Sequence, residues 1–338
     1  MVSLQIEQKN KIIKLKQGEM KEKRLIIVVI LCFCSSIFAQ NRAKEKEIVL
    51  NTEKCKIYGT LKMPQTKGKV PLVLIIAGSG ATDRDGNSPG GTCNAYKMLS
   101  DSLNRHGIAT LCYDKRFIAK SVSKQTEAEL RFTDYVDDAK SWIAILSQDS
   151  RFSQIIVAGH SEGSLIGMIA CGQNPKVSKF ISIAGAGSPA DEILKEQLSR
   201  QLAGQPALKN QVFSYIDELK QGWLLEKVPT DLYVLFRPSV QPYLISWFKY
   251  NPQEEIAKLK IPVLILQGDL DVQVSEDEAE LLHEACPNAK KVIIENMNHV
   301  LKNSHSTDVN EQLKDSYNNP TSPINTVLVE SIVAFVNL

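Results

Sequence analysis

The sequence GHSEG at residues 159–163 has the residue types and spacing of a serine nucleophile held in a tight turn. A strand-like segment, QIIVAG, precedes the turn, and a helix-like segment, SLIGMIAC, follows it. Side chains at Gly159 and Gly163 would collide with the neighbouring strand and helix, so both positions need glycine. The start of the helix also favours negative charge beside Ser161. The pattern predicts Ser161 as a nucleophile; a polar turn without chemistry is the alternative.

A serine hydroxyl is a weak nucleophile and requires a histidine base together with a carboxylate that orients the base. Where G-x-S-x-G has this context, the chain order is serine, acid, histidine. The segment IPVLILQG runs into a turn, in which we predict Asp271 as the acid and keep Asp269 as the alternative. His299 follows the segment KKVIIEN and is the predicted base, with His305 in reserve. The remaining histidines are expected to be structural: His106, His160 and His283.

Acyl transfer also needs two backbone N–H groups that stabilise the negative oxygen of the intermediate. Glu162, directly after the nucleophile, is predicted to supply one. The loop GSG at 78–80 follows the apolar segment VPLVLIIA, and its small residues let the backbone approach a substrate, so Ser79 is predicted to supply the other. An ordinary turn or a phosphate cradle is the alternative, but the nucleotide-binding motifs are missing. The cysteines have no metal-binding spacing, and no cofactor or metal is expected.

Strand-like and helix-like segments alternate along the chain and must position these residues. Continuous apolar runs indicate strands buried on both faces, and periodic apolar positions indicate helices. This alternation predicts a mostly parallel central sheet flanked by helices. Together with the G-x-S-x-G turn between a strand and a helix, it is typical of the α/β-hydrolase fold. The predicted strands are 47–51, 56–63, 70–77, 108–113, 155–158, 177–184, 262–266 and 291–294. The predicted helices are 94–105, 132–146, 161–171, 275–285 and 326–336.

Residues 186–255 interrupt the alternation, because they are helix-like with Gly and Pro breaks and lie between two predicted core strands. We expect them to form a helical cap, inserted between core segments 40–185 and 256–338. Most of the aromatic side chains in this segment are expected to pack against the core. They are Trp223, Phe236, Tyr243, Trp247, Phe248 and Tyr250.

The charge distribution gives no reason to expect a nucleic-acid partner. The chain carries 40 basic and 38 acidic residues, a net charge of +2. Residues 1–39 contain seven of the basic and three of the acidic residues, so the remainder has 33 basic and 35 acidic residues. The basic character therefore belongs to the N-terminus and not to a nucleic-acid-binding surface.

The N-terminus has the pattern of a secretory signal peptide. A basic stretch at 20–24 precedes an almost wholly apolar run of about 14 residues, and Ala39 offers a small residue for cleavage. The run is shorter than the roughly 20 residues that span a bilayer. We expect a signal peptide at 20–39, export to the periplasm or the medium, and no stable membrane span after cleavage; an uncleaved anchor is the alternative. Residues 1–19 fit poorly before a signal, which makes Met20 the expected start.

Four segments together resemble bacterial α/β-hydrolase carboxylesterases of the serine-aminopeptidase-like superfamily. They are GSGATDRDGN at 78–87, GHSEG at 159–163, GDLDVQV at 268–274 and MNHVLK at 297–302. The resemblance implies hydrolysis of esters with short acyl groups, no metal, and a helical cap.

One segment departs from this family. Relatives usually carry Gly directly after Arg116 and again two residues later, whereas this chain has Phe117 and Ala119, which leaves the shape of the loop open. The loop at 78–87 also carries charged residues near the expected mouth of the site. They are expected to brace the loop by ion pairs, with substrate binding as the alternative: Asp83, Arg84 and Asp85.

These observations predict a serine hydrolase that cleaves carboxylic esters through a Ser-His-Asp triad and an acyl-enzyme intermediate. A serine peptidase of the aminopeptidase type is the main alternative, and it would need an anchor for a peptide terminus, which Glu162 or a carboxylate in the cap could supply. A thioesterase is a third reading, and a non-catalytic binding protein is a remote one. The expected partner is a small-molecule ester, and the sequence makes no prediction of oligomeric state.

Overall fold

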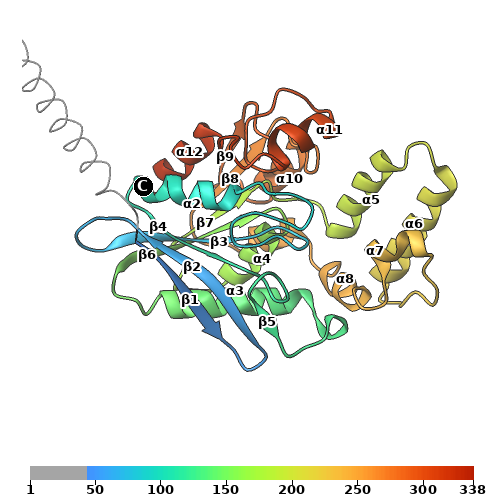
Figure 1. Ribbon diagram of the computed structural model, residues 1–338, viewed down its shortest axis with the longest axis horizontal. Helices are drawn as coiled ribbons and strands as arrows, with labels where there is room; N and C mark the ends of the chain where they lie inside the picture. The colour runs from blue at the N-terminus through green and yellow to red at the C-terminus, as the bar shows by residue number, and fades with distance from the viewer. Residues whose placement is uncertain (1–43) are drawn as a thin grey trace, which may run out of the picture. The chain divides into compact units, whose positions relative to one another are not determined.

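The computed structural model describes residues 44–338 (Figure 1). The expected N-terminal extension at 1–19 and the expected signal peptide at 20–39 lie outside the described residues. Within the described part, every helix is too short or too polar to cross a membrane.

Nine strands of the described chain form one sheet. In chain order they are β1 (Lys44–Asn51), β2 (Cys55–Met63), β3 (Val70–Ile76), β4 (Ala109–Tyr113), β5 (Val122–Ser123), β6 (Phe152–His160), β7 (Lys179–Ile183), β8 (Val263–Gly268) and β9 (Lys290–Ile294). Their spatial order is β1-β2-β4-β3-β6-β7-β8-β9, with β5 paired to β2. The pairs from β4 to β9 are parallel, while β1, β2 and β5 pair antiparallel. The predicted α/β-hydrolase fold class is confirmed.

Helices cover both faces of this sheet (Figure 1). They are α2 (Ala95–Arg105), α3 (Phe132–Leu146), α4 (Glu162–Cys171), α5 (Ala190–Gln201), α6 (Pro206–Lys220), α7 (Tyr233–Phe236), α8 (Gln241–Trp247), α9 (Pro252–Ala257), α10 (Glu276–Ala285), α11 (Val309–Gln312) and α12 (Thr326–Val336), with short turns η1 (Glu127–Glu129), η2 (Thr230–Leu232) and η3 (Leu313–Tyr317). Three predicted helices begin one residue later than expected. Their first predicted residues are Asn94, Ser161 and Ser275, whose backbone angles are not helical and which precede the first helical turn.

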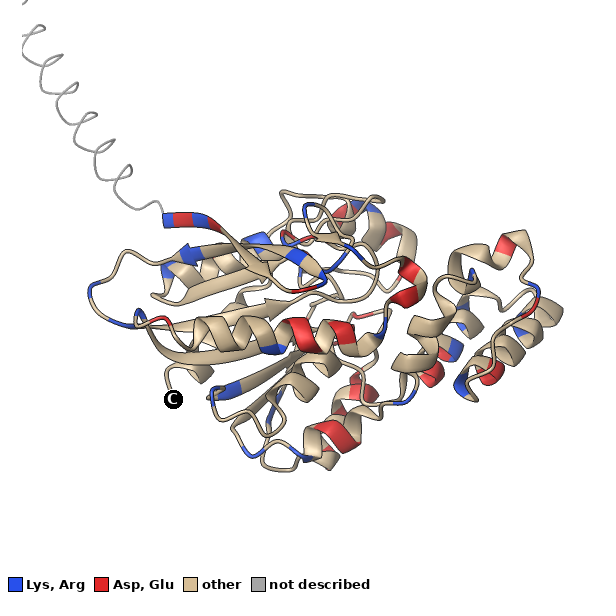
Figure 2. Ribbon diagram, turned by 90° about the horizontal axis from the view of Figure 1, so that it is seen from below, with Lys and Arg blue, Asp and Glu red and all other residues tan. Residues whose placement is uncertain are grey.

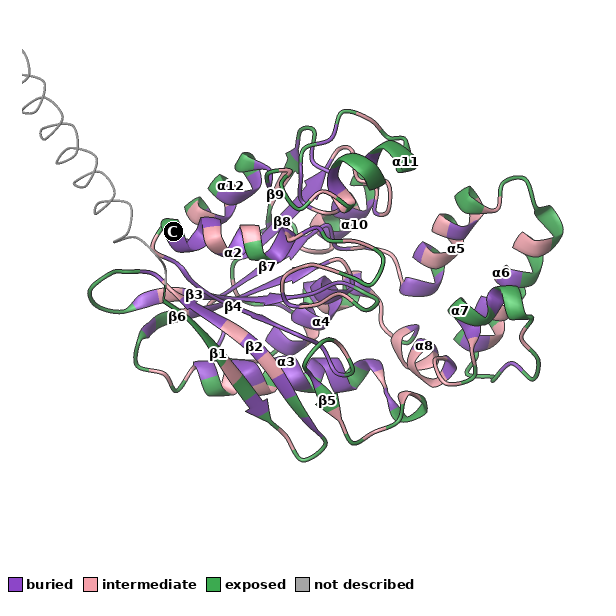
Figure 3. Ribbon diagram, in the orientation of Figure 1, coloured by how far each residue is buried: buried purple, intermediate pink, exposed green. Residues whose placement is uncertain are grey.

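Strand β3 shows why the sequences of the core strands are continuously apolar. Its side chains point alternately to the two faces of the sheet. Leu72 and Leu74 join the cluster shared with α3, α4, α9 and α10, whereas Val73 and Ile75 join the cluster shared with α2 and α12. Both faces are therefore covered, and the central strands are buried along their length (Figure 3).

The sheet reverses its winding between β3 and β6. The chain passes from β3 to its neighbour β4 on one side and then returns to place β6 on the other side of β3. Loops that leave two such strands diverge and open a crevice at their carboxyl ends, where ligands bind in open α/β sheets. Ser79 follows β3 and Ser161 follows β6, so both lie at this crevice.

Helices α5 to α8 have a hydrophobic cluster of their own, which includes Val212, Ile216 and Phe236. Aromatic residues of α8 and its C-terminal loop instead pack against the core: the rings of Tyr243, Trp247 and Tyr250 lie 6.3, 5.9 and 5.4 Å from that of Phe132 in α3. Phe236 and Phe248 are buried within the cluster. Trp223 is 61% exposed and belongs to neither cluster, so three of the six aromatic residues pack against the core, whereas most of them were expected to.

The loop after β4 contains Phe117 and Ala119, the two positions where glycine was expected. Phe117 has φ 67° and Ala119 has φ 46°, both in the left-handed region that glycine adopts without steric cost. The backbone therefore keeps a conformation suited to glycine, although side chains now occupy both positions. Each such residue stores about 1–2 kcal/mol of strain.

Replacing Ala119 by Gly should raise the free energy of unfolding by up to about 1 kcal/mol, because relief of strain outweighs the added entropy of the unfolded chain. Ala119 is exposed, so no packing is lost. Urea denaturation measures the change. The matched control is Ala144→Gly within α3, which should lower stability by about 1 kcal/mol. A loss of stability in Ala119→Gly would contradict the strain.

Candidate active site

Ser161 occupies the strained turn between β6 and α4. Its φ of 53° and ψ of −124° lie outside the regions of strand and helix. A Cβ added at Gly159 would lie 2.1 Å from the carbonyl oxygen of Gly163, and one added at Gly163 would lie 2.3 Å from the carbonyl oxygen of Ile76. Close packing of β6, α4 and β3 therefore requires both glycines, as the sequence indicated.

His299 and Asp271 form a buried pair beside this turn. His299 Nδ1 lies 2.8 Å from Asp271 Oδ2, which also accepts a hydrogen bond from Gln267. Asp271 Oδ1 accepts hydrogen bonds from the backbone N–H groups of Gln273 and Val274 at 2.8 and 2.9 Å. Burial by itself would raise the pKa of Asp271, but His299 and the N–H donors bring it below its ordinary value. The carboxylate is therefore held charged and fixed in direction.

The alternative residues lie elsewhere. Asp269, two residues before Asp271, has a buried Oδ1 without a hydrogen-bond partner among the described residues, and its carboxylate is not hydrogen-bonded to His299. His305 and His106 are exposed, and His283 belongs to α10. Of the two candidate acids, the structure pairs Asp271 with the candidate base.

Ser161 and His299 line the same cavity, which has a volume of about 320 Å³. No hydrogen bond joins the two side chains in the described part of the chain. Such bonds are often long in an enzyme without substrate and shorten in the reacting complex. Because Nδ1 faces Asp271, the Nε2 atom of His299 is the one left to act as a base toward Ser161.

The two predicted oxyanion donors follow β3 and β6. Neither the N–H of Ser79 nor that of Glu162 has a protein acceptor within residues 44–338. A Cβ placed on Gly78 would lie 3.0 Å from Cβ of Ser161, so the backbone of the loop runs close to the nucleophile. Both N–H groups are therefore available to a substrate oxygen at the crevice.

His160 has a structural role that the sequence indicated only in general terms. The N–H of Gly78 donates to Tyr96 Oη at 3.1 Å, and Tyr96 Oη donates to His160 Nδ1 at 2.7 Å. His160 Nε2 then donates to the carbonyl oxygen of His299 at 2.8 Å. Burial, helped by the nearby His299, lowers the pKa of His160 to about 3. A neutral His160 therefore links the loop at 78–87, the turn at Ser161 and the backbone of His299.

Lys and Arg residues alternate with Asp and Glu residues along much of the ribbon (Figure 2). Three consecutive charged residues after β4 are buried. Asp114 binds Arg84, with Nη2 to Oδ2 at 2.7 Å. Lys115 binds Glu162, with Nζ to Oε2 at 2.9 Å. The third residue, Arg116, binds Asp138 at 2.6 and 2.7 Å. Sequence reasoning missed these contacts; the only signal was the run DKR directly after an apolar strand.

The charged residues of the loop at 78–87 mostly hold the loop itself. Arg84 is buried between Asp114 and Glu47, and Asp83 Oδ1 accepts hydrogen bonds from the N–H groups of Asp85 and Asn87. Residues 83–85 do not line either cavity that contains Ser161. Arg84 braces the loop by ion pairs, as expected, whereas Asp83 holds it by hydrogen bonds to backbone N–H groups.

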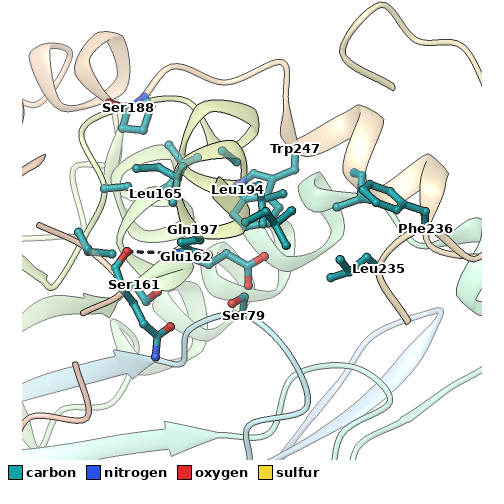
Figure 4. A pocket seen from close by; sticks show the side chains of 18 residues that line it. Ser79, Ser161, Glu162, Leu165, Ser188, Leu194, Gln197, Leu235, Phe236 and Trp247 are labelled. Carbon is teal, nitrogen blue, oxygen red and sulfur yellow. Dashed lines mark hydrogen bonds between the residues drawn. The ribbon is translucent and has the colours of Figure 1, made fainter. Parts of the chain in front are cut away.

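A second cavity adjoins Ser161, with a volume of about 190 Å³. It lies between α4 and helices α5, α7 and α8, with Ser161 toward one end and Phe236 toward the other (Figure 4). Apolar side chains form most of its wall, including Leu165, Ile193, Leu194, Leu198, Leu235, Leu244 and Trp247. His299 lines the 320 Å³ cavity but not this one. Among residues 44–338, no group of His, Cys, Asp and Glu could hold a metal ion.

The serine aminopeptidase S33 family matches residues 89–304, well over half of the chain. Esterase EstD of Thermotoga maritima is 26% identical over 262 residues, which cover 76% of this chain and 60% of EstD. Among solved structures, Est1E from Butyrivibrio proteoclasticus with bound ferulic acid has a TM-score of 0.57 at 18% identity, covering 86% of this chain and 98% of Est1E. An esterase of Pyrococcus furiosus has a TM-score of 0.55 at 16% identity, covering 88% and 90%.

Replacing Asp271 by Asn should lower kcat by about 10³–10⁴-fold, because the amide cannot stabilise the charged imidazole or hold its tautomer. Asp269→Asn is the matched control and should stay within tenfold of wild type, since His299 is hydrogen-bonded to Asp271 and not to Asp269. Steady-state kinetics on an activated ester measure both variants. The reverse ranking of the two variants would assign the acid to Asp269.

Proposed function

Because the chain belongs to the serine aminopeptidase S33 family of α/β hydrolases, we propose that it hydrolyses carboxylic esters through Ser161, His299 and Asp271. The observation that carries the proposal is the convergence at one crevice of a strained serine turn and a buried His–Asp pair. EstD and the Pyrococcus furiosus protein are named esterases, and Est1E binds ferulic acid, which supports the same reaction. The chain spans about 60% of the length of EstD, so that activity is a proposal for this protein.

In the proposed reaction His299 Nε2 takes the proton of Ser161 as Oγ attacks the ester carbonyl. The carbonyl electron pair moves to oxygen, which the N–H groups of Ser79 and Glu162 stabilise. The C–O bond to the alcohol then breaks, and His299 gives its proton to the leaving oxygen. Water repeats the sequence on the acyl-enzyme and releases the acid.

The two cavities suggest how the halves of the ester are placed. The leaving oxygen must reach His299, which lines the 320 Å³ cavity, so the alcohol belongs there. The acyl group then occupies the apolar 190 Å³ cavity beneath α5 and α8. This volume is below the roughly 300–1,000 Å³ of pockets for drug-sized ligands, which favours a short acyl group.

The contacts of Glu162 weigh against the peptidase alternative. An aminopeptidase would need a carboxylate to bind the ammonium group of its substrate. Glu162 is the one carboxylate that lines the two cavities in the described residues, and it already binds Lys115 and Tyr243. An ester needs no such anchor.

A series of p-nitrophenyl esters tests the proposal. We expect the highest kcat/KM for acyl groups of about two to four carbons and a decline for longer chains, because the apolar cavity is small. Aminoacyl-anilides and acyl thioesters of the same length should react more slowly. Faster cleavage of the anilides would favour the peptidase alternative.

Ser161→Ala is the control for this series. It should lower kcat by about 10⁴-fold or more while thermal denaturation stays unchanged. A fluorophosphonate probe should label the wild type at Ser161 and leave the variant unlabelled. Ester hydrolysis within tenfold of wild type in Ser161→Ala would refute the mechanism, and absence of labelling and turnover in the wild type would favour a binding protein.

We also propose that the protein is exported after removal of the signal peptide at 20–39. The support is the basic stretch, apolar run and small residue of the N-terminus. N-terminal sequencing of the protein recovered from the periplasm or the medium should begin near Gln40. A mature chain that begins at or near residue 1 would contradict this proposal.

A further inference from the structure

Lys115 lies in the interior with its side chain 2% exposed, directly behind the predicted oxyanion hole. Its Nζ atom donates to the carbonyl oxygen of Gly78 at 2.5 Å and to Glu162 Oε2 at 2.9 Å. The ammonium group also lies 4.9 Å from the centre of the Tyr135 ring. A buried cation thus joins two segments that are 84 residues apart in the chain.

These two segments are the ones that carry the oxyanion donors. The carbonyl of Gly78 and the N–H of Ser79 belong to the same peptide group. That group is planar and trans, since the described chain has no cis peptide bond, so its C=O and N–H point in opposite directions. Holding the carbonyl oxygen of Gly78 from behind therefore fixes where the N–H of Ser79 points.

The other backbone group of Gly78 is held separately, because its N–H donates to Tyr96. Tyr96 fixes the peptide before Gly78, and Lys115 fixes the peptide after it. Among residues 44–338, Lys115 is the only side chain that binds the carbonyl of the Gly78–Ser79 peptide. Rotation of this peptide would turn the Ser79 N–H away from a substrate.

Glu162 connects the same lysine to the second donor and to the cap. Its Oε2 binds Lys115, and its Oε1 accepts a hydrogen bond from the hydroxyl of Tyr243 in α8. Burial and the charge of Glu162 raise the pKa of Tyr243 well above its ordinary value, so the hydroxyl keeps its proton and donates. The side chain of Glu162 is thereby fixed at both oxygens, and its backbone N–H stays at the start of α4.

We propose that Lys115 is a positioning residue that sets the distance and direction between the two N–H donors of the oxyanion hole. The inference rests on the proposed hydrolase function of Ser161. Desolvation largely offsets the attraction within a buried ion pair, so the main consequence of the Lys115–Glu162 pair is geometric. The cation also polarises the Gly78–Ser79 peptide and makes its N–H a stronger donor.

Lys115→Met keeps most of the length of the side chain and removes the cation. We expect kcat on a short-chain p-nitrophenyl ester to fall by about 100-fold, comparable to the loss of one oxyanion donor, with KM within about threefold of wild type. A purely structural lysine would change stability without this division between kcat and KM.

A pair of ketone inhibitors gives the sharper measurement. A trifluoromethyl ketone adds to Ser161: the Oγ–carbon bond forms, the carbonyl electron pair moves to oxygen, and His299 takes the serine proton. Its affinity should fall in Lys115→Met by the same factor as kcat/KM. A methyl ketone of equal length, which binds without adding, should keep its affinity within about threefold.

Two further variants separate position from folding. Lys179→Met removes another buried lysine, which binds the carbonyl oxygens of Phe335 and Val336 at the opposite end of the sheet, and it should leave kcat unchanged. Lys115→Met combined with Glu162→Gln removes the unpaired charge that the single variant leaves behind. If Lys115→Met alone does not fold, kcat and the two ketone affinities are measured on the double variant instead.

A folded Lys115→Met, or the folded double variant, that keeps both kcat and trifluoromethyl ketone affinity within threefold of wild type would overturn the role of Lys115. Equal losses for the two ketones would also overturn it, because the defect would then lie in general binding. A wild-type protein that neither cleaves the ester nor binds the trifluoromethyl ketone would instead refute the proposed hydrolase function.

Discussion

Three charged side chains enter the interior in succession after β4, and each must be neutralised there. A buried charge without a partner is strongly destabilising, so every one of them fixes the segment that supplies its partner. Asp114 holds the loop at 78–87 through Arg84, Lys115 holds Gly78 and Glu162, and Arg116 holds α3 through Asp138. The three charged residues that follow β4 therefore hold the segments around the crevice in position from the interior of the protein.

The crevice itself follows from the winding of the sheet. Since β4 and β6 lie on opposite sides of β3, the loops that leave β3 and β6 separate and expose backbone N–H groups. Gly159 and Gly163 let β6, α4 and β3 pack more closely than side chains would permit. Ser161, in the tight turn between β6 and α4, has a strained backbone conformation. Hydrogen bonds through Tyr96 and His160 then connect this turn to the backbone of His299.

Helices α5 to α8 bear on the site in two ways. They form a wall of the apolar cavity next to Ser161, and α8 also stacks Tyr243 and Trp247 against Phe132 of the core. The hydroxyl of Tyr243 reaches Glu162, so the placement of α8 is tied to the residue that follows the nucleophile. The proposed acyl cavity and the proposed oxyanion donor at Glu162 thus both depend on where α8 packs.

The residue order alone predicted the fold class and the core elements, because strands buried on both faces are continuously apolar and turns need particular residue types. It also predicted the family resemblance, which the S33 match confirms. It also named Ser161 and His299 as candidates. It favoured Asp271 as the acid but kept Asp269 as an alternative, since only the packed turn shows which carboxylate faces the histidine. The run DKR after an apolar strand was the only local signal for Lys115, and it did not name the partners, because they come from distant segments that meet only when the sheet forms. Residue order therefore determined which groups could react, and tertiary packing decided which of them are held in position.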